Sequence, residues 1–230
     1  MSYVITPPAT VSAPVFGGGE FPVRRIYCVG RNYAEHAQEM GFTGREPPFF
    51  FLKPADALVP VKTGTTGQLD YPSLTANLHH EVELVVAIGR AGQNIAAADA
   101  ASHIWGYAVG LDMTRRDLQG EMKKQGRPWC IGKAFDQSAP IGELHAIAQT
   151  GELNRGAISL AVNGVVKQSG DLKDLIWSVN ETIEHLSAAW TLQPGDLIYS
   201  GTPAGVGAVV RGDVMEAAVA GLSGLRVAVR

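Results

Sequence analysis

The chain is short of cysteine and of charged residues, and each shortage excludes a class of protein. Only Cys28 and Cys130 occur in 230 residues, which excludes a domain built on disulfides. Both stand in apolar, strand-like contexts, so we expect buried thiols in a reducing compartment. Charged residues make up 18% of the chain, against about a quarter in average soluble proteins. We therefore expect a partner subunit to cover part of the surface.

Two further absences concern nucleic acid and membranes. The formal net charge is −3, so no basic surface argues for nucleic-acid binding. The sequence shows no basic-then-apolar leader and no apolar run long enough to span a bilayer. From these patterns we expect a soluble, cytoplasmic protein that binds neither nucleic acid nor membrane.

Glycine and proline, by contrast, are plentiful, with 27 and 13 residues, and they predict many turns in a β-rich fold. We interpret residues 1–22 as an extended arm and residues 23–230 as a single domain. Apolar runs predict strands at residues 26–29, 49–52, 79–88, 105–111, 158–162, 165–168 and 197–200, with a last hairpin at 214–230. Helices are expected at 31–41, at 96–104, from Thr114, and from 178 to 190.

Three local signals support these boundaries. Asn163-Gly164 predicts a type I′ hairpin between two strands. Ser178 and Glu181 form a capping box at the start of a helix, and Thr114 with Asp117 is a near match to another. Each signal fixes where one element begins or turns.

The organising stretch is His79-His80-Glu81-Val82-Glu83 followed by an apolar, β-branched run. On a strand Glu81 and Glu83 point to the same face, with Cα atoms about 6.5–7 Å apart. Their carboxylates either converge on one cation or belong to a frayed, solvated strand end. His79 and His80 face opposite sides, so at most one reaches such a cation, and we interpret both as supporting or structural residues.

Other charged residues stand at the ends of apolar segments. Asp112 ends a strand, and Arg115 and Arg116 follow at a helix start, which indicates either an anion site or a solvated basic face. Lys133 lies in apolar surroundings, so it is either paired with a carboxylate or has a depressed pKa. Lys53 ends an aromatic strand and points either into a site or to solvent.

His36 and Glu39 are three residues apart on an expected helix and so are neighbours on one face. A carboxylate orients an imidazole and raises its basicity, as a general base requires. The alternative is an ordinary surface pair.

Six short motifs in order give the chain a resemblance to a known family. They are Val29-Gly30-Arg31-Asn32-Tyr33, Phe51-Leu52-Lys53-Pro54, His79-His80-Glu81-Val82-Glu83, Gly110-Leu111-Asp112-Met113-Thr114, Gly132-Lys133 and Gly201-Thr202-Pro203-Ala204-Gly205-Val206-Gly207. From about residue 23 onward the sequence resembles the fumarylacetoacetate hydrolase family, in its short acylpyruvase and fumarylpyruvate hydrolase branch. The resemblance implies a homodimer and a β-rich α+β fold, with a mixed β-roll or β-sandwich-like core and a few short helices.

The resemblance also implies a metal site and a reaction. One divalent cation would be held by Glu81, Glu83 and Asp112, and three carboxylates suit a hard cation: Mg²⁺ first, with Mn²⁺ or Ca²⁺ possible. The expected reaction is hydrolysis of a carbon–carbon bond in a 2,4-diketo acid, with fumarylpyruvate, a ring-opened product of gentisate breakdown, as the leading substrate.

Residue roles follow from the same resemblance. The expected catalytic residues are His36 and Glu39, which activate water, and Lys133, which with Gln119 is a candidate donor to the oxyanion. The expected substrate-binding residues are Arg31, Lys53, Arg116, Gln119 and Thr202, with Thr202 on the substrate carboxylate. Arg31 or Arg45 would meet the distal carboxylate of fumarylpyruvate.

Other activities would use the same residues. Oxaloacetate decarboxylation needs a metal-stabilised enolate but no attacking water, and isomerases and hydratases of related fold also bind 2-keto acids. A module that binds a divalent ion without catalysis is the non-enzymatic alternative.

Overall fold

The computed structural model describes residues 3–33 and 45–230, and strands dominate it. The strands are β1 (Ser12–Pro14), β2 (Glu20–Pro22), β3 (Arg25–Gly30), β4 (Phe49–Lys53), β5 (Leu58–Pro60), β6 (Gly67–Leu69), β7 (Leu78–His80), β8 (Val82–Ile88), β9 (Ile104–Leu111), β10 (Thr114–Arg115), β11 (Ala139–Ile141), β12 (His145–Ala146), β13 (Ala157–Val162), β14 (Val165–Asp171), β15 (Asp196–Tyr199), β16 (Gly207–Val209), β17 (Val214–Val219) and β18 (Leu225–Val229). The helices are short: α2 (Arg116–Lys124), α3 (Cys130–Lys133), α4 (Ile147–Thr150) and α5 (Val179–Ala189), with 3₁₀ turns η1 (Ala55–Ala57), η2 (Ala97–His103) and η3 (Leu172–Asp174).

A mixed central sheet runs in the order β4-β3-β15-β8-β9-β11-β5, and β12 pairs with β9 at its side. β8 is buried on both faces, which explains why its residues are apolar apart from Glu83. Val82, Leu84 and Val86 pack into one hydrophobic cluster, and Val85 and Ala87 pack into the other. The central strands therefore separate two cores.

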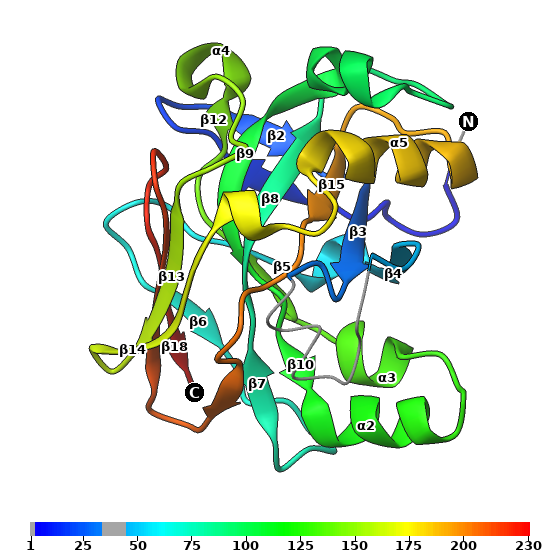
Figure 1. Ribbon diagram of the computed structural model, residues 1–230. Helices are drawn as coiled ribbons and strands as arrows, with labels where there is room; N and C mark the ends of the chain where they lie inside the picture. The colour runs from blue at the N-terminus through cyan, green and yellow to red at the C-terminus, as the bar shows by residue number, and fades with distance from the viewer. Residues whose placement is uncertain (1–2, 34–44) are drawn as a thin grey trace.

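A second sheet, β14-β13-β17-β18-β6, packs beside the central one, and a small sheet of β10, β7 and β16 completes the curled body (Figure 1). β13 contacts β8, and β17 contacts β9, so one core lies between the two larger sheets. α2 and α3 lie together at the end of the body where β10 begins (Figure 1). The β-rich α+β class with a rolled core, predicted from the sequence, is confirmed.

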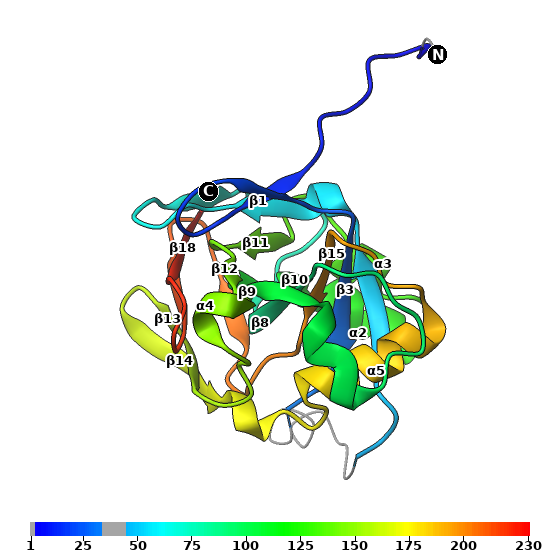
Figure 2. The same cartoon turned by 90° about the horizontal axis from the view of Figure 1, so that it is seen from above.

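The N-terminal segment makes a hairpin before the main fold begins. β1 and β2 pair in antiparallel fashion, and Ala13 and Phe21 are buried against the second hydrophobic cluster. Residues ahead of the hairpin are exposed and extend away from the body (Figure 2). The boundary between residues 22 and 23 stays a prediction.

The predicted hairpin turn and the predicted helix capping box are both present. Asn163 and Gly164 both have positive φ, 51° and 78°, as a type I′ turn requires, and they join β13 to β14. Ser178 and Glu181 form the reciprocal capping box at the start of α5. The last hairpin, β17–β18, also forms.

Replacing Ser178 with alanine is expected to destabilise the protein by about 1 kcal/mol, because the amide hydrogen of Glu181 loses its side-chain acceptor. The melting temperature should fall by about 2–4 °C for a chain of this length. Ser178→Asp, which keeps an acceptor at the cap, is the control and should melt close to the wild type. A melting temperature unchanged in Ser178→Ala would contradict the stabilising role of the cap.

Several sequence-based expectations are wrong in detail. Residues 79–88 are not one strand: β7 and β8 belong to different sheets and are separated by Glu81. Thr114 caps no helix, because it lies in β10 with a buried side chain, and Asp117 instead accepts hydrogen bonds from Thr75 and Ala76. Residues 97–103 wind as a 3₁₀ helix. Cys28 is buried as expected, but Cys130 is exposed on α3.

The helix expected at 31–41 falls largely on residues 34–44, which lie outside the described residues. Among the helices of the described residues, none is long and apolar enough to cross a membrane.

Candidate metal centre and substrate pocket

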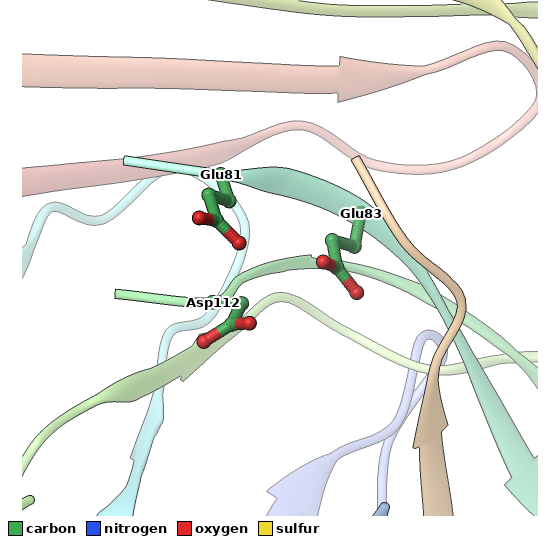
Figure 3. Close-up of side chains that lie close together, drawn as sticks. All are labelled: Glu81, Glu83 and Asp112. Carbon is green, nitrogen blue, oxygen red and sulfur yellow. The ribbon is translucent and has the colours of Figure 1, made fainter. Parts of the chain in front are cut away.

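Three buried carboxylates meet at the edge of the central sheet where β8 begins and β9 ends. In the described part of the chain, Glu81, Glu83 and Asp112 each offer a ligand atom, all within 4.8 Å of one another (Figure 3). Glu83 lies within β8, whereas Glu81 lies in the break between β7 and β8. The Asp112 amide donates to the Glu81 carbonyl at 2.9 Å, which holds the two chain segments side by side. The predicted ligands are therefore brought together by a strand break and a neighbouring strand end.

Cationic side chains surround this cluster. Lys133, fully buried, donates hydrogen bonds to Glu81 at 2.8 Å, to Asp112 at 2.6 Å and to the Thr114 hydroxyl at 2.6 Å. Burial alone would lower the pKa of Lys133, but the charges of Asp112 and Glu81 outweigh it and raise the pKa. Of the two sequence-based readings of Lys133, the structure therefore shows the paired one.

Lys53 and Arg116 complete the set of cations. Lys53 is buried, with Nζ 2.8 Å from Asp112 Oδ1 and donating to the carbonyl oxygens of Met113 and Lys133, so it points into the site. Arg116 pairs with Glu81. Three cationic side chains thus face three carboxylates, which explains how so many charges tolerate burial.

Glu83 is the least compensated of the carboxylates. Among the described residues, the backbone amide of Gly201 donates a hydrogen bond to Glu83 Oε2 at 2.9 Å. Burial, followed by the charges of Asp112 and Glu81, raises the pKa of Glu83 well above its usual value. Asp112 Oδ1, although close to Lys53, accepts no hydrogen bond of good geometry in the described residues. A buried oxygen that accepts no hydrogen bond, in a cluster of carboxylates that repel one another, fits a divalent cation that takes oxygen ligands.

A cavity of about 30 Å³ adjoins the cluster. The predicted site residues that line it are Arg31, Glu81, Glu83, Asp112, Arg116, Gln119, Lys133 and Thr202. Gln119 reaches the cavity from α2, which α3 approaches closely at Gly132. A Cβ added at Gly132 would lie 2.8 Å from the backbone nitrogen of Gln119. Arg116 Nη1 donates to Gln119 Oε1 at 2.6 Å, and within the described part of the chain no acceptor of the Gln119 NH₂ group is found.

A larger chamber of about 530 Å³ shares Arg31, Phe51, Trp129 and Lys133 with this cavity. Phe49, Phe50 and Trp129 give it aromatic walls, and Arg127 lies in its lining. The Arg31 guanidinium stands 5.2 Å from the ring centroid of Phe49. The acidic cluster thus adjoins a roomy aromatic space with two arginines.

His36 and Glu39 lie outside the described residues, so their roles stay predictions. Lys53, predicted to bind substrate, lines neither cavity and contacts Asp112 and the carbonyl oxygens of Met113 and Lys133 instead. Arg45 does not line either cavity: its guanidinium pairs with Glu181 and stands 4.1 Å from the Trp177 ring centroid. Of the two arginines offered for a distal carboxylate, only Arg31 lies at the site.

Supporting residues were harder to find from the sequence. Arg116 Nε donates to His79 Nδ1 at 3.4 Å, and His79 Nε2 lies 2.9 Å from Oδ1 of the Asn77 side chain. Burial, followed by the charge of Arg116, lowers the pKa of His79 to about 4, so the ring is neutral and can accept from Arg116. His80 contacts the side chain of Gln168. No sequence pattern pointed to Gln168, because its partners are 34 to 88 residues away.

Comparison with known proteins agrees with this geometry. Residues 25–230 match the family described as Fumarylacetoacetate (FAA) hydrolase C-terminal. The chain belongs to the fumarylacetoacetate hydrolase family. The crystal structure of fumarylpyruvate hydrolase from Pseudomonas aeruginosa in complex with Mn²⁺ and pyruvate is similar to this chain at 57% identity and a TM-score of 0.97, with 99% of each chain covered.

Relatives in the family carry other activities in their names. Oxaloacetate tautomerase YcgM of Escherichia coli (strain K12) is 42% identical over 195 residues, covering 84% of this chain and 87% of the relative. The mitochondrial oxaloacetate decarboxylase of Dictyostelium discoideum is 39% identical over 199 residues, covering 86% and 90%. The chain is thus a member of an enzyme family with a site suited to a divalent metal, and the family alone does not fix the reaction.

Proposed function

We propose that the protein is a hydrolase acting on carbon–carbon bonds in ketonic substances, which converts fumarylpyruvate and water to fumarate and pyruvate. The observation that carries this proposal is the acidic cluster set beside an aromatic chamber of about 530 Å³. Arg31 and Arg127 in that chamber can meet a second carboxylate. The relative that is 57% identical, a fumarylpyruvate hydrolase bound to Mn²⁺ and pyruvate, supports the same substrate.

The metal site fits this chemistry. A divalent cation on Glu81, Glu83 and Asp112, with Mg²⁺ preferred and Mn²⁺ or Ca²⁺ possible, would supply the Lewis acid that fixes the 2-keto acid and stabilises the departing enolate. Thr202 binds the carboxylate of the 2-keto acid. Arg116 and Lys53 hold the ligand carboxylates in place through the contacts described above.

Water attack would need a base and an oxyanion donor. His36, oriented by Glu39, takes a proton from water, which attacks the distal carbonyl carbon. Asn32 precedes His36 by four residues. Its side chain bonds to the backbone of Trp177 and donates to the Ser200 carbonyl, in the loop of residues 200–206 that carries Thr202 (the Thr202 loop). Four residues of fully extended chain span at most about 14 Å, which limits the Cα–Cα distance between Asn32 and His36.

Gln119 is the better placed donor to the oxyanion. The three Nζ hydrogens of Lys133 are already directed to Glu81, Asp112 and Thr114. Gln119, in contrast, has its carbonyl oxygen occupied by Arg116 and its NH₂ group available. We therefore assign Lys133 mainly to holding the charges of the site, and Gln119 to the oxyanion.

A substrate panel with Mg²⁺ or Mn²⁺ tests the proposal. Fumarylpyruvate, acetylpyruvate, fumarylacetoacetate and oxaloacetate are compared, with chelated protein as the control. We expect fumarylpyruvate to be hydrolysed with the highest kcat/KM. A steep preference for acetylpyruvate, which has no distal carboxylate, would contradict the substrate assignment. Turnover of none of the four would favour the non-catalytic, ion-binding alternative.

Oxaloacetate decarboxylation or tautomerisation is the second candidate, favoured by the relatives with those activities. Neither reaction needs an attacking water. His36→Ala is therefore expected to abolish hydrolysis while sparing any decarboxylation of oxaloacetate, which needs no proton taken from water. His185→Ala, a change in the helix α5, is the matched control. Equal loss of both activities in His36→Ala would contradict the role of His36 in activating water.

We also propose that the protein is a homodimer, because a chain with 18% charged residues leaves a surface suited to a partner. We further propose that it is cytoplasmic. The mass in solution tests the assembly, and a monomer would contradict it.

A further inference from the structure

The side chain of Gln168 joins the metal-binding strand to the loop that carries Thr202. Gln168 lies on β14 and is fully buried. Its Oε1 atom accepts a hydrogen bond from the Val82 amide at 3.1 Å, between the two glutamates of the cluster. Its Nε2 atom lies 2.7 Å from Thr202 Oγ1 and 2.9 Å from the Pro203 carbonyl oxygen. One amide therefore touches both halves of the site.

The orientation of this amide is settled by two backbone groups. The Val82 N–H can only donate, so the atom facing it is the carbonyl oxygen of Gln168. The Pro203 carbonyl can only accept, so the atom facing it is the NH₂ group. Because one NH₂ hydrogen goes to Pro203, the other is directed to Thr202. The Thr202 oxygen is consequently an acceptor toward Gln168.

This polarity fixes what Thr202 offers to the cavity. A hydroxyl group has a single hydrogen, and here its oxygen already receives one from Gln168. Within residues 3–33 and 45–230, no hydrogen bond donated by Thr202 is found. Thr202 lines the same cavity as the carboxylate cluster, so its hydrogen is available to an anionic oxygen of a ligand there.

The Thr202 loop is held against β14 on both sides of Gln168. A Cβ added at Gly205 would lie 2.1 Å from the Lys167 carbonyl oxygen, and one at Gly170 would lie 2.9 Å from Pro203 Cβ. Such close approach leaves Thr202 little room to turn away. His80 adds a further restraint: its Nδ1 lies 2.9 Å from Gln168 Oε1, which only accepts, so Nδ1 carries the hydrogen.

We propose that Gln168 is a positioning residue that makes Thr202 a hydrogen-bond donor to the carboxylate of the bound 2-keto acid. The inference rests on the proposed function, because it takes a 2-keto acid as the ligand of Thr202. Gln168 itself touches no substrate and acts only through Thr202. Its role is to set the direction of one hydroxyl hydrogen.

Pyruvate binding to the Mn²⁺-loaded protein, measured by calorimetry, tests this role without requiring turnover. Gln168→Met is expected to weaken pyruvate binding about 10- to 100-fold, the usual loss for one hydrogen bond to a charged group. Thr202→Val should cause a similar loss, and Thr202→Ser should restore binding. Gln125→Met, an exposed change on the end of α2, is the matched control and should bind as the wild type does.

The double variant Gln168→Met/Thr202→Val decides between positioning and general damage. If Gln168 acts through Thr202, the double variant binds pyruvate no more weakly than Thr202→Val alone. Losses that add in the double variant, or unchanged binding in Gln168→Met, would overturn the inference. A wild-type protein that binds Mn²⁺ but not pyruvate would overturn the proposed function instead.

Gln168→Met leaves the Val82 amide and the Pro203 carbonyl without partners and so risks misfolding. Gln168→Glu keeps the acceptor for Val82. It carries at most one hydrogen for the two acceptors that Gln168 serves, Thr202 and the Pro203 carbonyl. Its pyruvate affinity should therefore lie below that of the wild type, and wild-type affinity in folded Gln168→Glu would contradict the proposed polarity.

Discussion

The metal-free Lys133→Met variant is expected to be less stable than the wild type by about 3–5 kcal/mol, because it leaves buried carboxylates without their shared cation. Lys133 bridges Glu81 and Asp112, which are both buried. At about 2–4 °C per kcal/mol for a chain of this length, the melting temperature should drop by about 6–20 °C. Thermal unfolding of the chelated proteins measures this difference.

Added Mn²⁺ should recover much of that loss, since a divalent cation supplies the positive charge that the variant lacks. The metal-induced rise in melting temperature is therefore expected to be larger in Lys133→Met than in the wild type. Turnover at saturating Mn²⁺ should still fall about 10- to 100-fold, as it does when a partner that orients metal ligands is removed.

The matched control is Lys124→Met, which changes an exposed lysine at the end of α2. It should leave both the stability and the response to metal unchanged. A chelated Lys133→Met protein as stable as the wild type would show that the carboxylates do not depend on Lys133 for compensation.

The parts of the structure that sequence patterns predicted well are governed by local chemistry. The Asn163-Gly164 turn forms because both residues tolerate positive φ. The capping box at Ser178 forms because its partner is three residues away. The pair Glu81 and Glu83 was indicated by its spacing on a strand, and the resemblance to the family added Asp112 to it.

The parts that were missed depend on contacts between distant segments. The break at Glu81 exists because β7 pairs with β10 and β16 while β8 pairs with β9 and β15. Thr114 was expected to cap a helix, but pairing of β10 with β7 and the hydrogen bond from Lys133 bury it instead. Gln168 gave no sequence signal, because its amide acquires a role only when three separate segments meet around it.

Glu83→Gln is expected to be more stable than the wild type without metal and less stable than the wild type with metal. The folded-state pKa of Glu83 is raised above the usual 4.5 by burial and by the charges of Asp112 and Glu81. The contribution of this group to the free energy of unfolding is therefore full below the unfolded pKa and is lost as the pH rises through the folded pKa. Metal-free Glu83→Gln should escape this loss and be more stable than the metal-free wild type above that pH.

Bound metal should make the wild type more stable than Glu83→Gln. At a concentration a hundred times its Kd, a cation that binds only the folded wild type adds about 2.7 kcal/mol, or about 5–11 °C in melting temperature. Glu83→Gln, which has lost one charged ligand, should show little of this rise, although its amide oxygen can still accept from Gly201. Melting curves with and without Mn²⁺ across a pH series measure both effects.

Glu216→Gln is the matched control, because Glu216 is half exposed and pairs with Arg226 away from the cluster. Its metal response and pH profile should follow the wild type. Two results would count against this account of Glu83: a full metal-induced rise in Glu83→Gln, or a stability difference from the wild type that shrinks as the pH rises. Either result would mean that the charge of Glu83 is already compensated before a cation binds.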